Sequence, residues 1–124
     1  MAAKLMEGRS TAHAALAAGV TYRQADWWAR QGLLRPVGGD GSGSARKWAH
    51  REVQLMWLLG QLALLVGRLP ESVETFRQLD EFGGFAVWQP GKGPVAHLDI
   101  LDHATLGDTV TAIVPLHLCP IATA

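Results

Sequence analysis

Arginine, glutamine and tryptophan side chains are concentrated in one stretch, which reads TYRQADWWARQGLLRP. Arg23 and Gln24 are of the types that form paired hydrogen bonds with guanine and adenine edges, and Arg30 can reach a base edge or a phosphate. Adjacent positions on a helix point about 100° apart, so Trp27 and Trp28 are expected to have different roles. The stretch therefore predicts a helix with one polar, basic face and one apolar face.

Two short helices are expected to position these side chains. The first is predicted over residues 11–18, with a hydroxyl cap at its start and Gly19 at its end. Thr21 and Gln24 have the spacing of a capping box, so the second helix is predicted over residues 22–31, before a glycine and a proline. Two helices joined by a short glycine-containing turn are typical of a helix-turn-helix, whose second helix enters the major groove of DNA.

The spacing within the second helix sorts its side chains into two groups. Ala25 and Trp28 lie three positions apart and share a face, so they are expected to pack inward with Leu16, Val20 and Leu33. The side chains expected to face outward, at least in part, are Arg23, Gln24, Trp27 and Arg30.

The next segment, residues 33–48, has the pattern of a hairpin. It contains an apolar start, a Gly/Ser tip over residues 38–44, and a return through Arg46, Lys47 and Trp48. Basic side chains on the return can lie against a phosphate backbone, as in the wing of a winged helix-turn-helix. A structureless linker is the alternative interpretation of a Gly/Ser tract.

The net charge of zero hides an uneven distribution along the chain. Residues 1–51 hold eight basic residues against three acidic ones, a balance of +5, and residues 52–124 hold three against eight, a balance of −5. This division predicts one cationic surface that faces a polyanion, with the acidic remainder turned away.

Two further helices are expected after the hairpin. Residues 50–66 are apolar on nearly every side, which predicts burial against either the C-terminal segment or a second subunit. The apolar run is too short to cross a bilayer. Residues 69–79 have the pattern of an amphipathic helix, with a proline suited to its first turn.

The C-terminal part reads as strands. The stretch FAVWQPGKGPVAHLDI contains two strand-like runs around a PGKG turn, and residues 109–118 form a third candidate. The predicted fold is α+β, a winged helix-turn-helix followed by two helices and a small antiparallel sheet. We expect residues 1–82 to form the DNA-binding unit and residues 83–124 a β-rich dimerisation element.

Residues 10–79 resemble the DNA-binding domain of the MerR family of bacterial transcription regulators, in the forms common in actinobacteria and their phages. The matching text is STAHAALAAGVTYRQADWWARQGLLRP, then GSARKWAHREV, then LLGQLALLVGRLPESVETFRQL. The long coiled-coil helix that joins many MerR-type dimers is missing.

The resemblance implies roles for individual residues. Arg23 falls where the family has a DNA-contacting arginine, Trp27 where a tyrosine reaches a phosphate, and Trp28 where an aromatic packs in the core. Arg46 matches the wing arginine, and Trp48 replaces the usual wing tyrosine. Trp27 has no hydroxyl, although its indole N–H can donate to a phosphate.

Other chemistry has little support in the sequence. Histidine, aspartate and cysteine residues occur near the C-terminus without the paired spacing of a structural zinc site; they are His97, Asp99, Asp102, His103, His117 and Cys119. Nucleotide-binding loops, hydrolase motifs and a nucleophile with its base are not found. We therefore expect no enzymatic activity, no cofactor and no metal. The single cysteine, with no signal peptide expected, favours the cytoplasm.

These patterns predict a sequence-specific transcription regulator that binds double-stranded DNA and forms a homodimer. The resemblance to the MerR family also implies contact with RNA polymerase. The residues expected at the DNA surface are Thr21, Tyr22, Arg23, Gln24, Trp27, Arg30, Arg46 and Lys47. One alternative is an architectural DNA-binding factor of a phage or mobile element, similar to an excisionase or a small terminase subunit. Another is a protein-interaction module that inherited the fold.

Overall fold

The computed structural model describes residues 10–38, 46–101 and 111–121. Within these residues the chain forms four α-helices, one 3-10 helix and three strands. In chain order they are α2 (Thr11–Ala18), α3 (Tyr22–Arg30), α4 (His50–Val66), α5 (Glu74–Arg77), β1 (Phe85–Trp88), β2 (Ala96–Leu98), β3 (Ala112–Pro115) and the 3-10 helix η1 (Leu116–Leu118). The mixed helix and sheet content confirms the α+β class.

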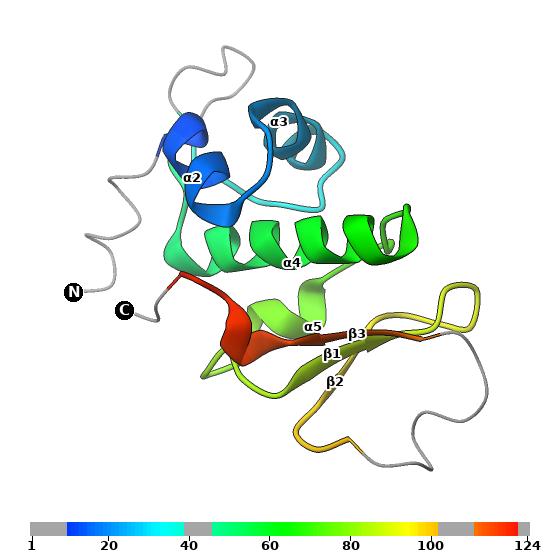
Figure 1. Ribbon diagram of the computed structural model, residues 1–124. Helices are drawn as coiled ribbons and strands as arrows, with labels where there is room; N and C mark the ends of the chain where they lie inside the picture. The colour runs from blue at the N-terminus through cyan, green and yellow to red at the C-terminus, as the bar shows by residue number, and fades with distance from the viewer. Residues whose placement is uncertain (1–9, 39–45, 102–110, 122–124) are drawn as a thin grey trace.

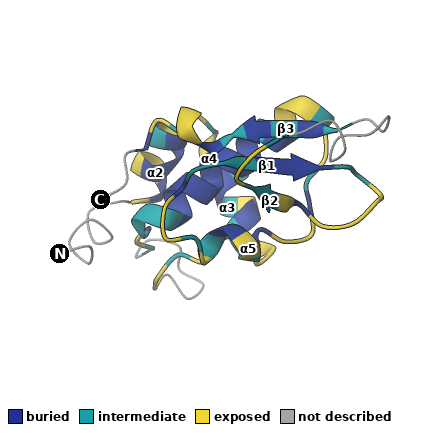
Figure 2. Ribbon diagram, turned by 90° about the horizontal axis from the view of Figure 1, so that it is seen from below, coloured by how far each residue is buried: buried dark blue, intermediate teal, exposed yellow. Residues whose placement is uncertain are grey.

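The elements are arranged on two sides of α4 (Figure 1). Helices α2 and α3 lie on one side, and α5 and the sheet lie on the other. Residues 52–60 of α4 are all buried, because neighbouring elements cover the helix on both sides. Figure 2 shows buried residues along α4, β1 and β3. The sequence predicted that α4 is buried against either the C-terminal segment or a second subunit. The structure shows the C-terminal segment of the same chain in this place.

The first two helices begin and end where local signals place them. The Ser10 hydroxyl accepts from the backbone N–H of His13 at 3.2 Å, and Gly19 ends α2 with a φ of 75°. The predicted capping box is present at the start of α3, with Thr21 Oγ1 accepting from the N–H of Gln24 at 3.0 Å. Helix α3 ends at Arg30, one residue earlier than predicted.

The inward face of α3 is as predicted except at one position. Ala25 and Trp28 are buried, and Val20 and Leu33 pack against the core. Leu16, however, is 80% exposed, so its predicted inward packing is wrong. Helix α2 instead turns small residues toward its neighbours, and these are Thr11, Ala14, Ala15 and Ala18. Small side chains allow close helix contact, which leaves Leu16 on the outer face.

The sheet is antiparallel, with β1 between β2 and β3. Phe85 of β1 is opposite Leu98 of β2 and Pro115 of β3. Alternate residues of β3, Ala112 and Val114, are buried on the side of α4, as expected for a sheet with one covered face. All three predicted strand regions contain a strand, although residues 109 and 110 lie outside the described residues.

The second predicted helix after the hairpin is much shorter than expected. Only Glu74–Arg77 is helical, instead of residues 69–79. Ser72 Oγ accepts from the backbone N–H of Glu74 at 3.1 Å, and such a local bond competes with helix formation before that point. Arg51 Nη1 donates to the carbonyls of Phe76 and Leu79, at 2.8 and 2.7 Å. These bonds stabilise an early end of the helix. In the described part of the chain, no helix is both long enough and apolar enough to cross a membrane.

Candidate nucleic-acid interface

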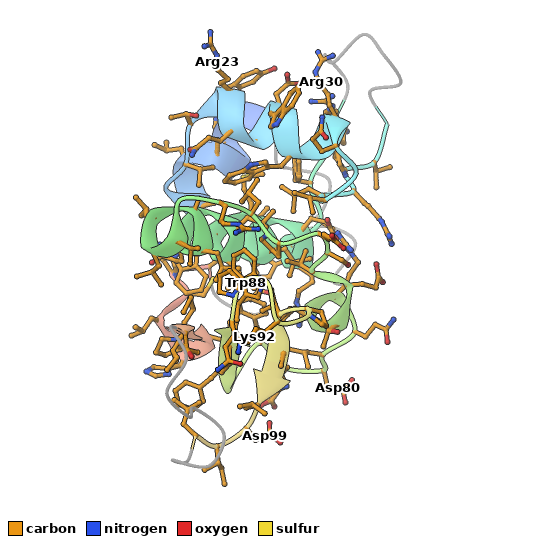
Figure 3. The ribbon with its side chains drawn as sticks, turned by 90° about the vertical axis from the view of Figure 1, so that its right-hand side faces the viewer. Arg23, Arg30, Asp80, Trp88, Lys92 and Asp99 are labelled. Carbon is orange, nitrogen blue, oxygen red and sulfur yellow. The ribbon has the colours of Figure 1, made fainter. Side chains whose placement is uncertain are left out.

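Helix α3 presents its predicted reading face to solvent. Tyr22 and Trp27 are 53% and 55% exposed, and Arg23 is exposed beside them. Figure 3 shows Arg23 and Arg30 projecting from the end of the molecule that lies opposite the sheet. The buried Trp28 on the other face of the helix holds α3 in this orientation. The different roles predicted for Trp27 and Trp28 are thus confirmed in their burial.

The capping box restricts what Gln24 can offer. Its Oε1 accepts from the backbone N–H of Thr21 at 3.0 Å, while its own backbone N–H donates to Thr21 Oγ1. Bidentate recognition of adenine needs both the oxygen and the NH2 group of the amide. While the cap is intact, only the NH2 group of Gln24 remains free to donate.

Asp26 joins two of the predicted DNA-contacting arginines. Arg30 Nε donates to its Oδ2 at 2.8 Å, and Arg46 Nη1 donates to its Oδ1 at 2.6 Å. Hydrogen bonds from Arg46 and then from Arg30 lower the pKa of Asp26 below its usual range. Asp26 was not among the residues predicted at the site. Its spacing to Arg30, four residues on a helix, could have indicated that pair, but nothing local indicated Arg46.

The two arginines differ in access to solvent. The side chain of Arg46 is only 10% exposed, whereas that of Arg30 is 61% exposed. Arg30 therefore lies on the open surface, as predicted. Arg46 is directed toward α3, where it pairs with Asp26, and its predicted contact with the DNA backbone stays a prediction.

The described ends of the 33–48 segment lie side by side. Val37 and Lys47 form an isolated antiparallel bridge, with N–O distances of 2.8 and 2.9 Å between their backbones. Lys47 is exposed. Trp48 is fully buried, and its Nε1 donates to Thr11 Oγ1 at 2.9 Å. Trp48 thus anchors the return of this segment to α2. Most of the predicted Gly/Ser tip, residues 39–45, lies outside the described residues.

A buried ion pair fixes the other end of this segment. Glu52 of α4 is 5% exposed, and its Oε1 accepts from the backbone N–H of Arg35 at 2.7 Å. Arg77 Nε lies 2.6 Å from Glu52 Oε2, and Arg77 Nη2 donates to the carbonyl of Leu33 at 2.9 Å. The hydrogen bond to Glu52 raises the pKa of the Arg77 guanidinium. Residues 33–35 at the start of the segment are therefore held against both α4 and α5, and nothing in the sequence pattern predicted this arrangement.

The basic residues of the first part of the chain do not all gather on one surface. Arg51 lies on the α5 side of α4, where burial lowers its pKa, and Arg35 forms an ion pair with Glu74 at 2.9 Å. The predicted single cationic surface is wrong for these two residues. Lys4 and Arg9 lie outside the described residues. At the opposite end of the molecule from α3, Figure 3 shows two acidic side chains, Asp80 and Asp99.

The histidine and cysteine residues of the C-terminal part have other surroundings. His97 Nε2 lies 2.7 Å from the carbonyl oxygen of Gly83, and the His97 ring meets the ring of Phe76 edge-on. Burial raises the pKa of the Cys119 thiol. Across the described ranges, no group of three histidine, cysteine or acidic residues could hold a metal ion. Asp102 and His103 lie outside those ranges.

Comparisons of the chain with protein-family models, curated proteins and solved structures find no match. Any function proposed for the chain therefore rests on its residues and their geometry.

Proposed function

We propose that the chain is a sequence-specific regulator of transcription, which binds double-stranded DNA through a winged helix-turn-helix. In this proposal α3 enters the major groove, and residues 33–48 contact the DNA backbone. The observation that carries the proposal is the two-sided character of α3. Ala25 and Trp28 fasten one face to the protein, while Arg23 and Trp27 stand in solvent on the other.

The position of α3 supports entry into a groove. A helix with its side chains is about 10–12 Å across, close to the width of the major groove of B-DNA. Helix α3 lies at the edge of the molecule, on the side of α4 away from the sheet (Figure 1). Among the described elements, none covers its outer face.

The distribution of ion pairs supports separate roles for the cations. Within the described residues, ion pairs bind Arg30, Arg35, Arg46 and Arg77 but neither Arg23 nor Lys47. Arg23 projects from the helix and is assigned to a base edge. Lys47 projects from the segment beside it and is assigned to a phosphate, where it adds affinity without sequence information.

The regulatory role, the contact with RNA polymerase and the homodimer follow from the resemblance to MerR-type regulators. The covered face of the sheet packs on α4 of the same chain, so a dimer formed by residues 83–124 would use other surfaces. Ile100 and Leu118 are exposed apolar residues available there, at 77% and 61%.

Selection of duplexes from a randomised pool by the purified full chain tests the proposal. We expect one sequence to be enriched, and its affinity to fall linearly with the logarithm of salt concentration. Footprinting at a promoter would support regulation, whereas an attachment or packaging site would favour the architectural alternative. If the chain binds no duplex at low salt, the proposal is overturned, and the protein-interaction alternative is favoured.

Substitution of the proposed reading residue sharpens the test. Arg23→Ala should cost about 1–3 kcal/mol of binding free energy and relax discrimination at one base position. Lys92→Ala is a matched control, because it removes one exposed cation at the sheet end of the molecule (Figure 3). Fluorescence anisotropy with the selected duplex and single-base variants measures both effects. Equal losses for the two variants would contradict the assignment of α3.

A further inference from the structure

Asp26 is an acidic residue on the helix that is proposed to meet a polyanion. A carboxylate close to phosphates is repulsive, so its presence on α3 requires a separate explanation. Its two oxygens each accept a hydrogen bond from a different arginine, one on α3 and one on the 33–48 segment. Asp26 therefore links the proposed reading helix to the proposed backbone-binding segment through an ion pair with Arg46.

Because of the pair between Asp26 and Arg46, the adjacent side chains of Arg46 and Lys47 point in opposite directions. Arg46 turns inward to Asp26 and is 10% exposed, while Lys47 is exposed. Successive side chains of an extended segment point to opposite sides, so fixing one residue also fixes its neighbour. The backbone of Lys47 is also held by its antiparallel bridge to Val37. The buried Trp48 anchors the same return to α2, and the pair between Asp26 and Arg46 is what fixes the Lys47 ammonium relative to α3.

The two ion pairs of Asp26 also limit how many cations can bind phosphates. A guanidinium that is hydrogen-bonded to Asp26 must give up that bond, or share its donors, before it binds a phosphate. Each phosphate contact adds about 0.9 to the salt slope of binding to B-DNA, and this contribution carries no sequence information. Two arginines held by one carboxylate therefore keep the sequence-independent part of the affinity low.

We propose that Asp26 is a specificity-determining positioning residue. It fixes the return of the 33–48 segment on α3, and it withholds Arg30 and Arg46 from indiscriminate contact with phosphates. This inference rests on the proposed DNA-binding function. Loss of the carboxylate frees both guanidiniums, which strengthens binding to any duplex. It also loosens the return of the segment on α3, and this loss weakens only binding that depends on register, so unrelated duplexes gain more than the selected duplex.

The experiment compares three variants of the full chain. Asp26→Asn keeps the shape but removes the charge, and Asp26→Glu keeps the charge. Asp99→Asn removes one charge at the opposite end of the molecule, where Asp99 is exposed (Figure 3). Binding to the selected duplex and to a scrambled duplex is measured by anisotropy at several salt concentrations.

The expected result is a change in both salt slope and specificity. Asp26→Asn should steepen the slope for the scrambled duplex by about 1–2. Its gain in affinity over the wild type should therefore be roughly four- to sixteenfold larger at 50 mM than at 200 mM salt. The ratio of scrambled to selected dissociation constants should fall, because only the selected duplex loses contacts that depend on register. Asp26→Glu should stay near the wild-type slope, and Asp99→Asn should leave slope and ratio unchanged.

Hydrogen exchange, measured without DNA, tests whether the pair between Asp26 and Arg46 holds the return segment. The Lys47 N–H donates to the Val37 carbonyl at 2.9 Å, so its hydrogen exchange reports how firmly the return segment is held. Exchange there should be faster in Asp26→Asn and unchanged in Asp99→Asn.

Three outcomes separate the two proposals. If the wild-type chain binds no duplex, the proposed function fails. If it binds but Asp26→Asn matches Asp99→Asn in slope and ratio, only the inference about Asp26 fails. Unchanged exchange at Lys47 in Asp26→Asn would overturn the positioning role by itself.

Discussion

The two sides of α4 hold arginine side chains in different ways. On the α3 side, Arg30 and Arg46 share the carboxylate of Asp26, which is 26% exposed. On the sheet side, Arg77 pairs with Glu52, whose side chain is 7% exposed, and it also donates to a backbone carbonyl. The buried Glu52–Arg77 pair holds elements of the fold together. The Asp26 carboxylate is more open to solvent, and its pair with the exposed Arg30 can exchange with water or a ligand.

The comparison shows what a count of charges along a chain leaves out. Arg51 and Arg77 carry the same formal charge as Arg23, yet both donate to carbonyls inside the fold. Only Arg23 of these three stands on the open face of α3. Basic residues become a binding surface when the fold leaves their hydrogen-bond donors without internal acceptors.

The largest expected effect comes from breaking the buried pair. Glu52→Ala should lower the free energy of unfolding by about 3–5 kcal/mol. Arg77 would lose its buried carboxylate and keep only the more exposed Glu74 as a counterion, and the Arg35 N–H would lose its acceptor. Urea unfolding followed by tryptophan fluorescence measures the loss. Glu71→Ala, which removes an exposed carboxylate, is the control. Similar losses in the two variants would contradict a structural role for the buried pair.

A smaller effect is expected at the anchor of the return segment. Trp48→Phe removes the bond from Trp48 Nε1 to Thr11 Oγ1 and leaves the buried hydroxyl without its donor, at a cost of about 1–3 kcal/mol plus lost packing. Thr11→Val in the same chain removes the orphaned hydroxyl. Chemical unfolding of both single variants and the double variant should show a double-variant loss below the sum. Simple additivity would mean that the hydrogen bond contributes little.

The smallest effect is expected at the two pairs of Asp26, whose carboxylate is less buried than that of Glu52. The pKa of Asp26 in the folded chain lies below its ordinary value of 3.8, chiefly through its bond with Arg46. A depressed pKa means that the stabilising contribution is present at higher pH and is lost as pH falls through the folded pKa. Arginine stays protonated throughout this range. The melting-temperature difference between wild type and Asp26→Asn should therefore be constant above about pH 5 and shrink below about pH 4. A difference that grows on acidification would contradict the assigned pairs.

Local signals in the chain were sufficient for the first two helices and their limits. A hydroxyl or glycine at a helix end acts on backbone groups within a few residues, so Ser10, Gly19 and the Thr21–Gln24 box are readable without tertiary information. Period-three spacing likewise predicted the burial of Ala25 and Trp28. The same reasoning failed for Leu16, because the choice between neighbouring faces of α2 depends on which partner helix can approach most closely.

The exposure of single side chains at the candidate site could be predicted from the sequence, but the ion pairs between them could not. The sequence indicated Arg23, Trp27 and Arg30 as outward-facing, and they are exposed. It could not indicate that Arg46 meets Asp26, because the two are separated by twenty positions in the chain. The extent of α5 was overestimated for a related reason, since Arg51 from a distant helix binds the carbonyls at its end.

The sequence by itself determined the helix limits, the strand regions and the polar face of α3, because these depend on caps, turns and spacing over a few residues. The tertiary structure alone decided which cations remain available at the surface. That outcome depends on which distant acceptors the folded chain brings within hydrogen-bonding distance of each guanidinium, and spacing along the chain does not contain those distances.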